Sequence, residues 1–131
     1  MTSAEYRTLV AGVAQGPLLA LSEPLSLWGG LDPDSGMIID RSHPEGGQRV
    51  SGRVLYMSHG RGSSSSSSVL AEAIRLGTAP SAIITSDIDS ILMTGAMVAS
   101  LLYGRSCPVL CGPKPTGEWD EIDESGTVKV R

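Results

Sequence analysis

The sequence has 131 residues, 40% of them hydrophobic, and its ten basic and fourteen acidic side chains give a formal net charge of −4. This length and apolar content predict one domain over residues 1–131 with a single modest core. The acidic balance argues against nucleic-acid binding, and no apolar run is long enough to cross a membrane. Because no basic stretch is followed by an apolar one near the N-terminus, we expect a cytoplasmic protein without an export signal.

The N-terminal third predicts short strands joined by turns. We expect strands at 6–13 and 18–21, separated by a break at Gly16-Pro17, and a further strand at 37–40. Residues 23–36 are dense in Pro, Gly and Asp but also contain Trp28 and several leucines. This mixture indicates an ordered surface loop of the kind that lines a site or an interface.

The second half alternates strand and helix patterns. Strands are expected at 53–57, 82–85 and 108–111, and helices at 69–76 and 91–103, with Gly77 and Gly104 after them. This order predicts a parallel β-α-β-α-β unit. The loops 58–68 and 86–90 should therefore both open at the carboxyl end of the sheet, where α/β folds bind ligands.

The loop at 58–68 is the main candidate site. Gly60 and Gly62 permit a tight turn, the serine run Ser63–Ser68 suits a helix start, and Arg61 adds a positive charge. If the N–H groups of the first helical turn point outward unpaired, they attract an anion. A flexible linker and an anion-binding turn without chemistry are the alternatives. A nucleotide loop is disfavoured because there is no Gly-Lys-Ser/Thr ending.

Several other polar residues are interpreted as structural. His43 is expected to be a structural or surface residue, and Asp87 and Asp89 to be helix-capping and loop residues, with catalysis or ligand binding as the alternative for each. Cys107 and Cys111 are expected to be packed thiols, and the chain is expected to bind no metal by itself. The acidic run at 118–124 is expected to be a solvated turn before a last strand at 127–130.

Five segments together resemble the swivel domain of the aconitase X family: residues 24–36, 43–44, 60–65, 72–80 and 82–84. The resemblance covers about residues 6–111. It implies a swivelling β/β/α fold, in which a β-rich N-terminal layer packs against the β-α-β-α-β unit. It also implies that the chain is a free-standing small subunit.

The resemblance also implies roles for individual residues. Ser63 corresponds to the serine that, as an alkoxide, removes a proton next to a substrate carboxylate, and Arg61, Gly62, Ser64 and Ser65 would bind substrate. Ser65 stands where aconitases themselves have an arginine that grips the substrate carboxylate. Anion recognition should then come from backbone N–H groups, neighbouring hydroxyls, Arg61 or another subunit.

The implied reaction is a dehydration. The resemblance favours conversion of cis-3-hydroxy-L-proline to Δ1-pyrroline-2-carboxylate, active only with a large subunit whose cysteines hold an iron or iron–sulfur centre. Dehydration of mevalonate 5-phosphate by a similar pair of subunits is the alternative. A non-catalytic module that binds an anion or serves assembly is an alternative of another class.

Overall fold

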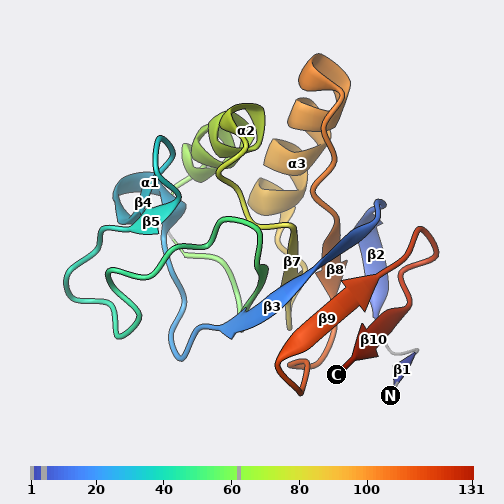
Figure 1. The fold of residues 1–131 in the computed structure, drawn as a ribbon. Coiled ribbons are helices and arrows are strands. Elements are labelled where there is room, and N and C mark those ends of the chain that lie inside the picture. The colour runs from blue at the N-terminus through green and yellow to red at the C-terminus, as the bar shows by residue number, and fades with distance from the viewer. Residues whose placement is uncertain (1, 4–5, 62) are drawn as a thin grey trace.

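The computed structural model describes residues 2–3, 6–61 and 63–131. The N and C termini lie close together in Figure 1, because the first and last strands pair with each other. No helix in the described part of the chain combines the length and the apolar character needed to cross a bilayer. In chain order the elements are β1 (Thr2–Ser3), β2 (Arg7–Val10), β3 (Ala14–Ala20), α1 (Leu27–Gly30), β4 (Leu31–Asp32), β5 (Met37–Ile38), β6 (Val54–Met57), α2 (Ser66–Leu76), β7 (Ala82–Thr85), α3 (Ser90–Tyr103), β8 (Val109–Cys111), β9 (Trp119–Ile122) and β10 (Val128–Val130).

A sheet of eight strands in the order β1-β10-β9-β3-β6-β7-β8-β2 forms the framework. The neighbouring strands β6, β7 and β8 are parallel, and α2 and α3 follow β6 and β7, which confirms the predicted β-α-β-α-β unit. Figure 1 shows α2 and α3 together on one side of the parallel strands β6, β7 and β8, while the same sheet curls so that β9 and β10 lie on their other side.

Strand β3 joins the two parts of the sheet, and the predicted break at Gly16-Pro17 is wrong. Its first half pairs antiparallel with β9 as far as Pro17, and its second half pairs parallel with β6 from Leu18 onward. The proline sits where the strand changes partner, a place where a missing N–H is tolerated. Gly16 is required there, because a Cβ on it would stand 2.2 Å from the carbonyl oxygen of Gly52.

Alternate residues of the central strands feed two separate cores. Leu55 and Met57 of β6 face the cluster beneath the helices, while Val54 and Tyr56 face the cluster beneath β9 and β10. A buried strand that packs on both faces is largely apolar, as β6 is and as β7 is up to its last residue, Thr85. The result is the β/β/α arrangement that the resemblance implied. The β-rich layer also contains the C-terminal strands β9 and β10, in addition to N-terminal residues.

The acidic run near the C-terminus is a strand, so the prediction of a solvated turn at 118–124 is wrong. Residues Trp119–Ile122 form β9 between β3 and β10, with Asp120 and Ile122 facing inward. Buried and half-buried side chains alternate along β9, but the sequence shows no matching alternation of apolar and polar residues, because one of the buried positions is Asp120.

Candidate functional site

The loop between β6 and α2 places Ser63 at the surface, at the carboxyl end of β6. The Ser63 side chain is exposed, and its Oγ accepts a hydrogen bond from the backbone N–H of Ser65 at 3.2 Å. The carbonyl oxygen of Ser63 accepts another from the N–H of Ser66 at 3.0 Å. The hydroxyl is therefore held from behind by an amide while its other side is open. Gly62, predicted to bind substrate, lies outside the described residues.

The amides of the first helical turn are mostly paired, which corrects the expectation that they point outward free. The N–H groups of Ser66, Ser67 and Ser68 donate to the carbonyl oxygens three residues earlier at 3.0–3.1 Å. Serine runs readily form such tight turns ahead of a helix. As a consequence α2 begins at Ser66, three residues before the predicted start, and anion attraction cannot rest on these three amides.

A small hollow of about 70 Å³ opens beside Ser63. Its polar lining includes Arg61, Ser63 and Asp89, and its apolar lining includes Leu25, Leu27 and Ile91. Binding pockets for small molecules usually enclose about 300–1,000 Å³. The hollow, as the described residues form it, is therefore too small to enclose a substrate of that kind.

Ser64 and Ser65, the other predicted substrate-binding serines, are exposed and do not line the hollow in the described structure. The carbonyl oxygen of Ser64 accepts hydrogen bonds from the backbone N–H and from the side-chain hydroxyl of Ser67. Of the predicted residues that the structure describes, Arg61 and Ser63 are brought together at the hollow. Contact of Ser64 and Ser65 with substrate stays a prediction.

Asp89 caps α3, as expected, and also faces the hollow. Its Oδ1 accepts the N–H of Leu92 at 2.9 Å, and its Oδ2 lies so close to Gly60 that a Cβ there would stand 1.7 Å away. Gly60 is thus needed for close approach of the carboxylate rather than for a positive φ. The sequence signal was that both loops follow neighbouring parallel strands and so meet at one edge.

The loop at 23–36 packs against the start of α2, which confirms that it is ordered. Leu25 and Leu27 are buried, and the Oγ of the buried Ser66 accepts the N–H of Trp28 at 3.2 Å. The Trp28 side chain itself is 61% exposed. This loop therefore forms the apolar wall of the hollow and presents an aromatic ring to the outside.

Arg61 gives the site its positive charge. Hydrogen bonds from Ser42 hold the pKa of Asp40 below its ordinary value, with a smaller contribution from the positive charge of Arg61. Arg61 therefore lies near enough to Asp40 to interact with it while also lining the hollow.

His43 and the two cysteines lie in structural settings. The Nε2 of the buried His43 is 2.9 Å from the Glu23 carbonyl oxygen, and its Nδ1 accepts the N–H of Glu45. Cys107 is buried and Cys111 half-buried; both thiols are free, and burial raises the pKa of Cys107 to about 12. These observations support the structural interpretation of all three side chains.

The remaining predicted groups add no ligands to the site. Asp87 is exposed, and its backbone carbonyl accepts the Thr85 hydroxyl. Within the described ranges, no group of three or more His, Cys, Asp or Glu side chains could hold a metal ion. The residues described here therefore do not fit an iron or iron–sulfur centre, and no chemical step below is routed through one.

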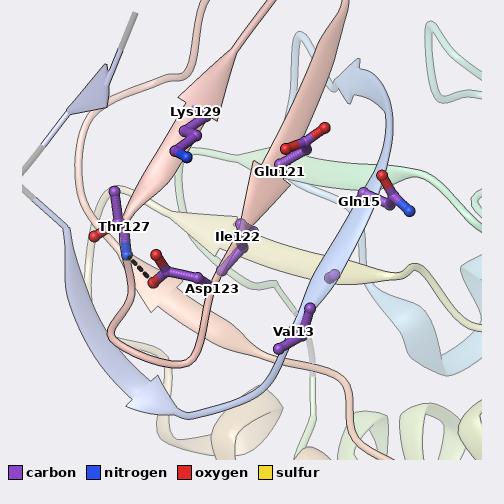
Figure 2. A pocket seen from close by; sticks show the side chains of 8 residues that line it. Val13, Gln15, Glu121, Ile122, Asp123, Thr127 and Lys129 are labelled. Carbon is purple, nitrogen blue, oxygen red and sulfur yellow. Dashed lines mark hydrogen bonds between the residues drawn. The ribbon is translucent and has the colours of Figure 1, made fainter.

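A larger hollow of about 420 Å³ lies over β3, β9 and β10, away from the helices (Figure 2). Its carboxylates are engaged within the chain: Glu121 pairs with Arg131, and Asp123 accepts the N–H of Thr127. Hydrogen bonds, chiefly from Ser125, lower the pKa of Asp123. Because nearby cations and donors already satisfy its carboxylates, we assign this hollow no chemistry.

The fold defines a swivelling β/β/α domain with an open serine loop after its strand β6. Sequence similarity assigns this domain to a particular protein family. The family model of the aconitase X swivel domain matches residues 3–131, and the chain belongs to this family.

Relatives and a solved structure support this placement. The chain is 52% identical over 105 residues to cis-3-hydroxy-L-proline dehydratase of Pseudomonas aeruginosa, a match covering 80% of this chain and 18% of that protein. It is 40% identical over 97 residues to the phosphomevalonate dehydratase small subunit of Methanothermobacter thermautotrophicus, covering 74% of each. Aconitase X of Thermococcus kodakaraensis, in a holo-form crystal structure, matches with a TM-score of 0.85 and 30% identity, covering 97% of this chain and 96% of that one.

Proposed function

We propose that this chain is the small subunit of a hydro-lyase that dehydrates cis-3-hydroxy-L-proline, with Ser63 as the base. The single observation that carries the proposal is the exposed Ser63 Oγ, held by the Ser65 amide at the mouth of an incomplete hollow that also contains Arg61. The 52% identity to a cis-3-hydroxy-L-proline dehydratase supports the choice of substrate.

The chemistry assigned to Ser63 is proton removal. As an alkoxide, its Oγ takes the proton from the carbon next to the substrate carboxylate, and the C–H electron pair forms the new C=C bond. The neighbouring C–O bond breaks with its electron pair, and the hydroxyl leaves as water once protonated. The resulting enamine shifts a proton to give Δ1-pyrroline-2-carboxylate.

The surroundings of Ser63 favour this role in two ways. A serine hydroxyl is a poor base until its oxyanion is stabilised, and fixed N–H donors in a site closed to water supply such stabilisation. The Ser65 amide is one such donor. Since the amides of Ser66–Ser68 donate within the turn, Arg61 is the group of this chain best placed to attract the substrate carboxylate.

A large subunit would supply the rest of the site. The matched segment is 18% of the Pseudomonas aeruginosa enzyme, so most of that protein has no counterpart in this chain. In our proposal the large subunit closes the hollow, donates the proton that the leaving hydroxyl needs, and carries the iron or iron–sulfur centre, which would supply Lewis-acid chemistry when bound. This chain would be inactive alone, and we place the pair in the cytoplasm.

Dehydration of mevalonate 5-phosphate is the second candidate, because a specific observation favours it. The archaeal relative is itself a small subunit, and this chain covers 74% of its length, whereas the bacterial dehydratase is a much longer chain. The share of the relative that is covered thus favours mevalonate 5-phosphate, whereas sequence identity favours cis-3-hydroxy-L-proline.

The two candidates are separated by assay of the assembled pair. The complex of this chain with the aconitase X large subunit of the same organism is offered each substrate, and formation of Δ1-pyrroline-2-carboxylate or loss of mevalonate 5-phosphate is followed. We expect turnover of cis-3-hydroxy-L-proline. Turnover of mevalonate 5-phosphate alone would reverse the assignment, and turnover of neither would favour the non-catalytic module.

A further inference from the structure

Helix α3 carries no charged side chain although much of it faces outward. Its sequence from Ser90 to Tyr103 contains no Asp, Glu, Lys or Arg. Leu92, Ala96 and Ala99 pack inward, while Leu101 is 82% and Leu102 68% exposed. The outer face of a surface helix is normally polar and charged, and a helix that is apolar all round is normally covered. Figure 1 shows the C-terminal end of α3 projecting from the body of the molecule.

A groove of about 370 Å³ lies between α2 and α3, with Ser67, Ser68 and Glu72 on its α2 side. Gly95 and Ala71 line it, with Val98 and Tyr103 on the α3 side. The helices approach closely at Gly95, where a Cβ would stand 2.7 Å from the carbonyl oxygen of Ser67. Met97, Val98 and Tyr103 are each about two-fifths exposed or more, so the groove and the helix face form one patch.

This patch is continuous with the Ser63 hollow. Ser66 lines the hollow and Ser67, the next residue, lines the groove; likewise Ile91 lines the hollow and Gly95, one turn later, lines the groove. A body that closes the hollow can therefore extend along the outer face of α3, whose own side chains carry no charge, with the Glu72–Arg75 ion pair of α2 beside the groove. At 1.5 Å per residue the helix offers a seam roughly 20 Å long.

We propose that the outer face of α3 and the α2–α3 groove dock the aconitase X large subunit through an uncharged, apolar surface of that partner. The inference rests on the proposed function for the identity of the partner. Obligate interfaces are larger and more apolar than transient ones, and an exposed apolar face such as that of α3 is the kind of surface that an obligate interface covers. A second copy of this chain is a poorer occupant, because it would add another open wall and another net charge of −4.

The relatives supply a second reason for this occupant. In the Pseudomonas aeruginosa dehydratase the matched segment is 18% of one polypeptide, so the remainder is tethered to this domain. The large subunit is expected to take the place of that remainder. The partner that must complete the site is thus also the body available to cover α3.

The test replaces two exposed leucines by charge. We expect Leu101→Glu/Leu102→Glu to weaken binding to the aconitase X large subunit of the same organism at least tenfold by isothermal titration calorimetry. Val13→Glu is the matched control, since Val13 is 64% exposed and lies beside the hollow over β3, β9 and β10. The control should bind as wild type, and both variants should keep the wild-type melting temperature. If the double variant melts early, Leu101→Glu alone is titrated instead.

Wild-type affinity in the charged variant would overturn the proposal. So would a wild-type dimer of this chain, detected by light scattering, that the substitution abolishes while binding of the large subunit is unchanged, because α3 would then dock a second copy. The readout does not use turnover. If the pair binds through α3 but dehydrates neither acid, the docking inference stands and the proposed function fails.

Discussion

At the scale of single residues, the site depends on how Ser63 is held. Its Oγ is exposed and takes one backbone N–H, from Ser65, while its carbonyl starts the turn into α2. The N–H groups of Ser66–Ser68 donate to carbonyl oxygens within the turn. The serine run therefore positions the Ser63 hydroxyl and does not offer these three amides to an anion. In the proposed function, Arg61 and the large subunit would then provide the remaining positive charge.

The contact between Gly60 and Asp89 can be tested by stability. Because a Cβ at Gly60 would meet the Asp89 carboxylate at 1.7 Å, Gly60→Ala should displace it from the N–H of Leu92. Loss of an N-cap costs about 0.5–2 kcal/mol, so we expect Gly60→Ala and Asp89→Ala each to lower the free energy of unfolding by about 1 kcal/mol. Urea denaturation of both single variants and the double variant measures this.

The double variant is the informative member of that set. If both substitutions act through the same cap, the free energy of unfolding of the double variant should be no lower than that of the less stable single variant. Additive losses would show that Gly60 and Asp89 stabilise the fold independently.

At the scale of elements, β9 contains a buried carboxylate without a partner. Asp120 is fully buried, and neither carboxylate oxygen has a hydrogen-bond partner within the described chain. Burial raises its pKa from the ordinary 3.8 to about 6. The folded state therefore binds this proton more tightly than the unfolded state, and the destabilisation is full above about pH 6 and fades as the pH falls toward 3.8.

We expect Asp120→Asn to raise the free energy of unfolding by on the order of 1 kcal/mol near pH 8, with a smaller gain near pH 4. Urea denaturation across this pH range measures the effect. Glu124→Gln, which removes an exposed acid from the turn after β9, is the control and should leave the pH profile unchanged. A gain from Asp120→Asn that does not depend on pH would contradict the account.

Much of the element order could be predicted from the sequence, because local patterns determine it. The strands β6, β7 and β8 are apolar runs, and Gly77 and Gly104 end α2 and α3 with φ of +80° and +63°. The partner change of β3 at Pro17 could not be predicted, because it depends on which strands lie on either side. The strand at 119–122 was missed because acidic composition resembled a solvated turn, although Asp120 is buried.

Part of the candidate site could likewise be predicted from the sequence and part could not. Ser63 and Arg61 were placed by a local motif next to a strand end, and the structure brings them together. The role of Asp89 at the hollow depends on the spacing between two loops, and the engagement of the amides of Ser66–Ser68 depends on turn geometry. Neither is encoded in a local pattern.

At the scale of the whole molecule, a domain with two cores carries a small open hollow. The sheet is packed on both faces, while the Ser63 hollow measures only about 70 Å³ and opens outward. The uncharged α3 face begins beside that hollow. Both features make sense together if the domain works only when docked, with the serine facing the reacting carbon across the interface.

The most direct test is the turnover of cis-3-hydroxy-L-proline by the assembled complex carrying Ser63→Ala, compared with Ser64→Ala. Ser64 is a neighbouring exposed serine that does not line the described hollow, and both complexes are first shown to assemble as wild type. Removal of an active-site base or nucleophile typically lowers kcat by several orders of magnitude, so we predict a loss of about a thousandfold or more for Ser63→Ala and less than about tenfold for Ser64→Ala. Wild-type turnover in the Ser63→Ala complex would contradict the central claim.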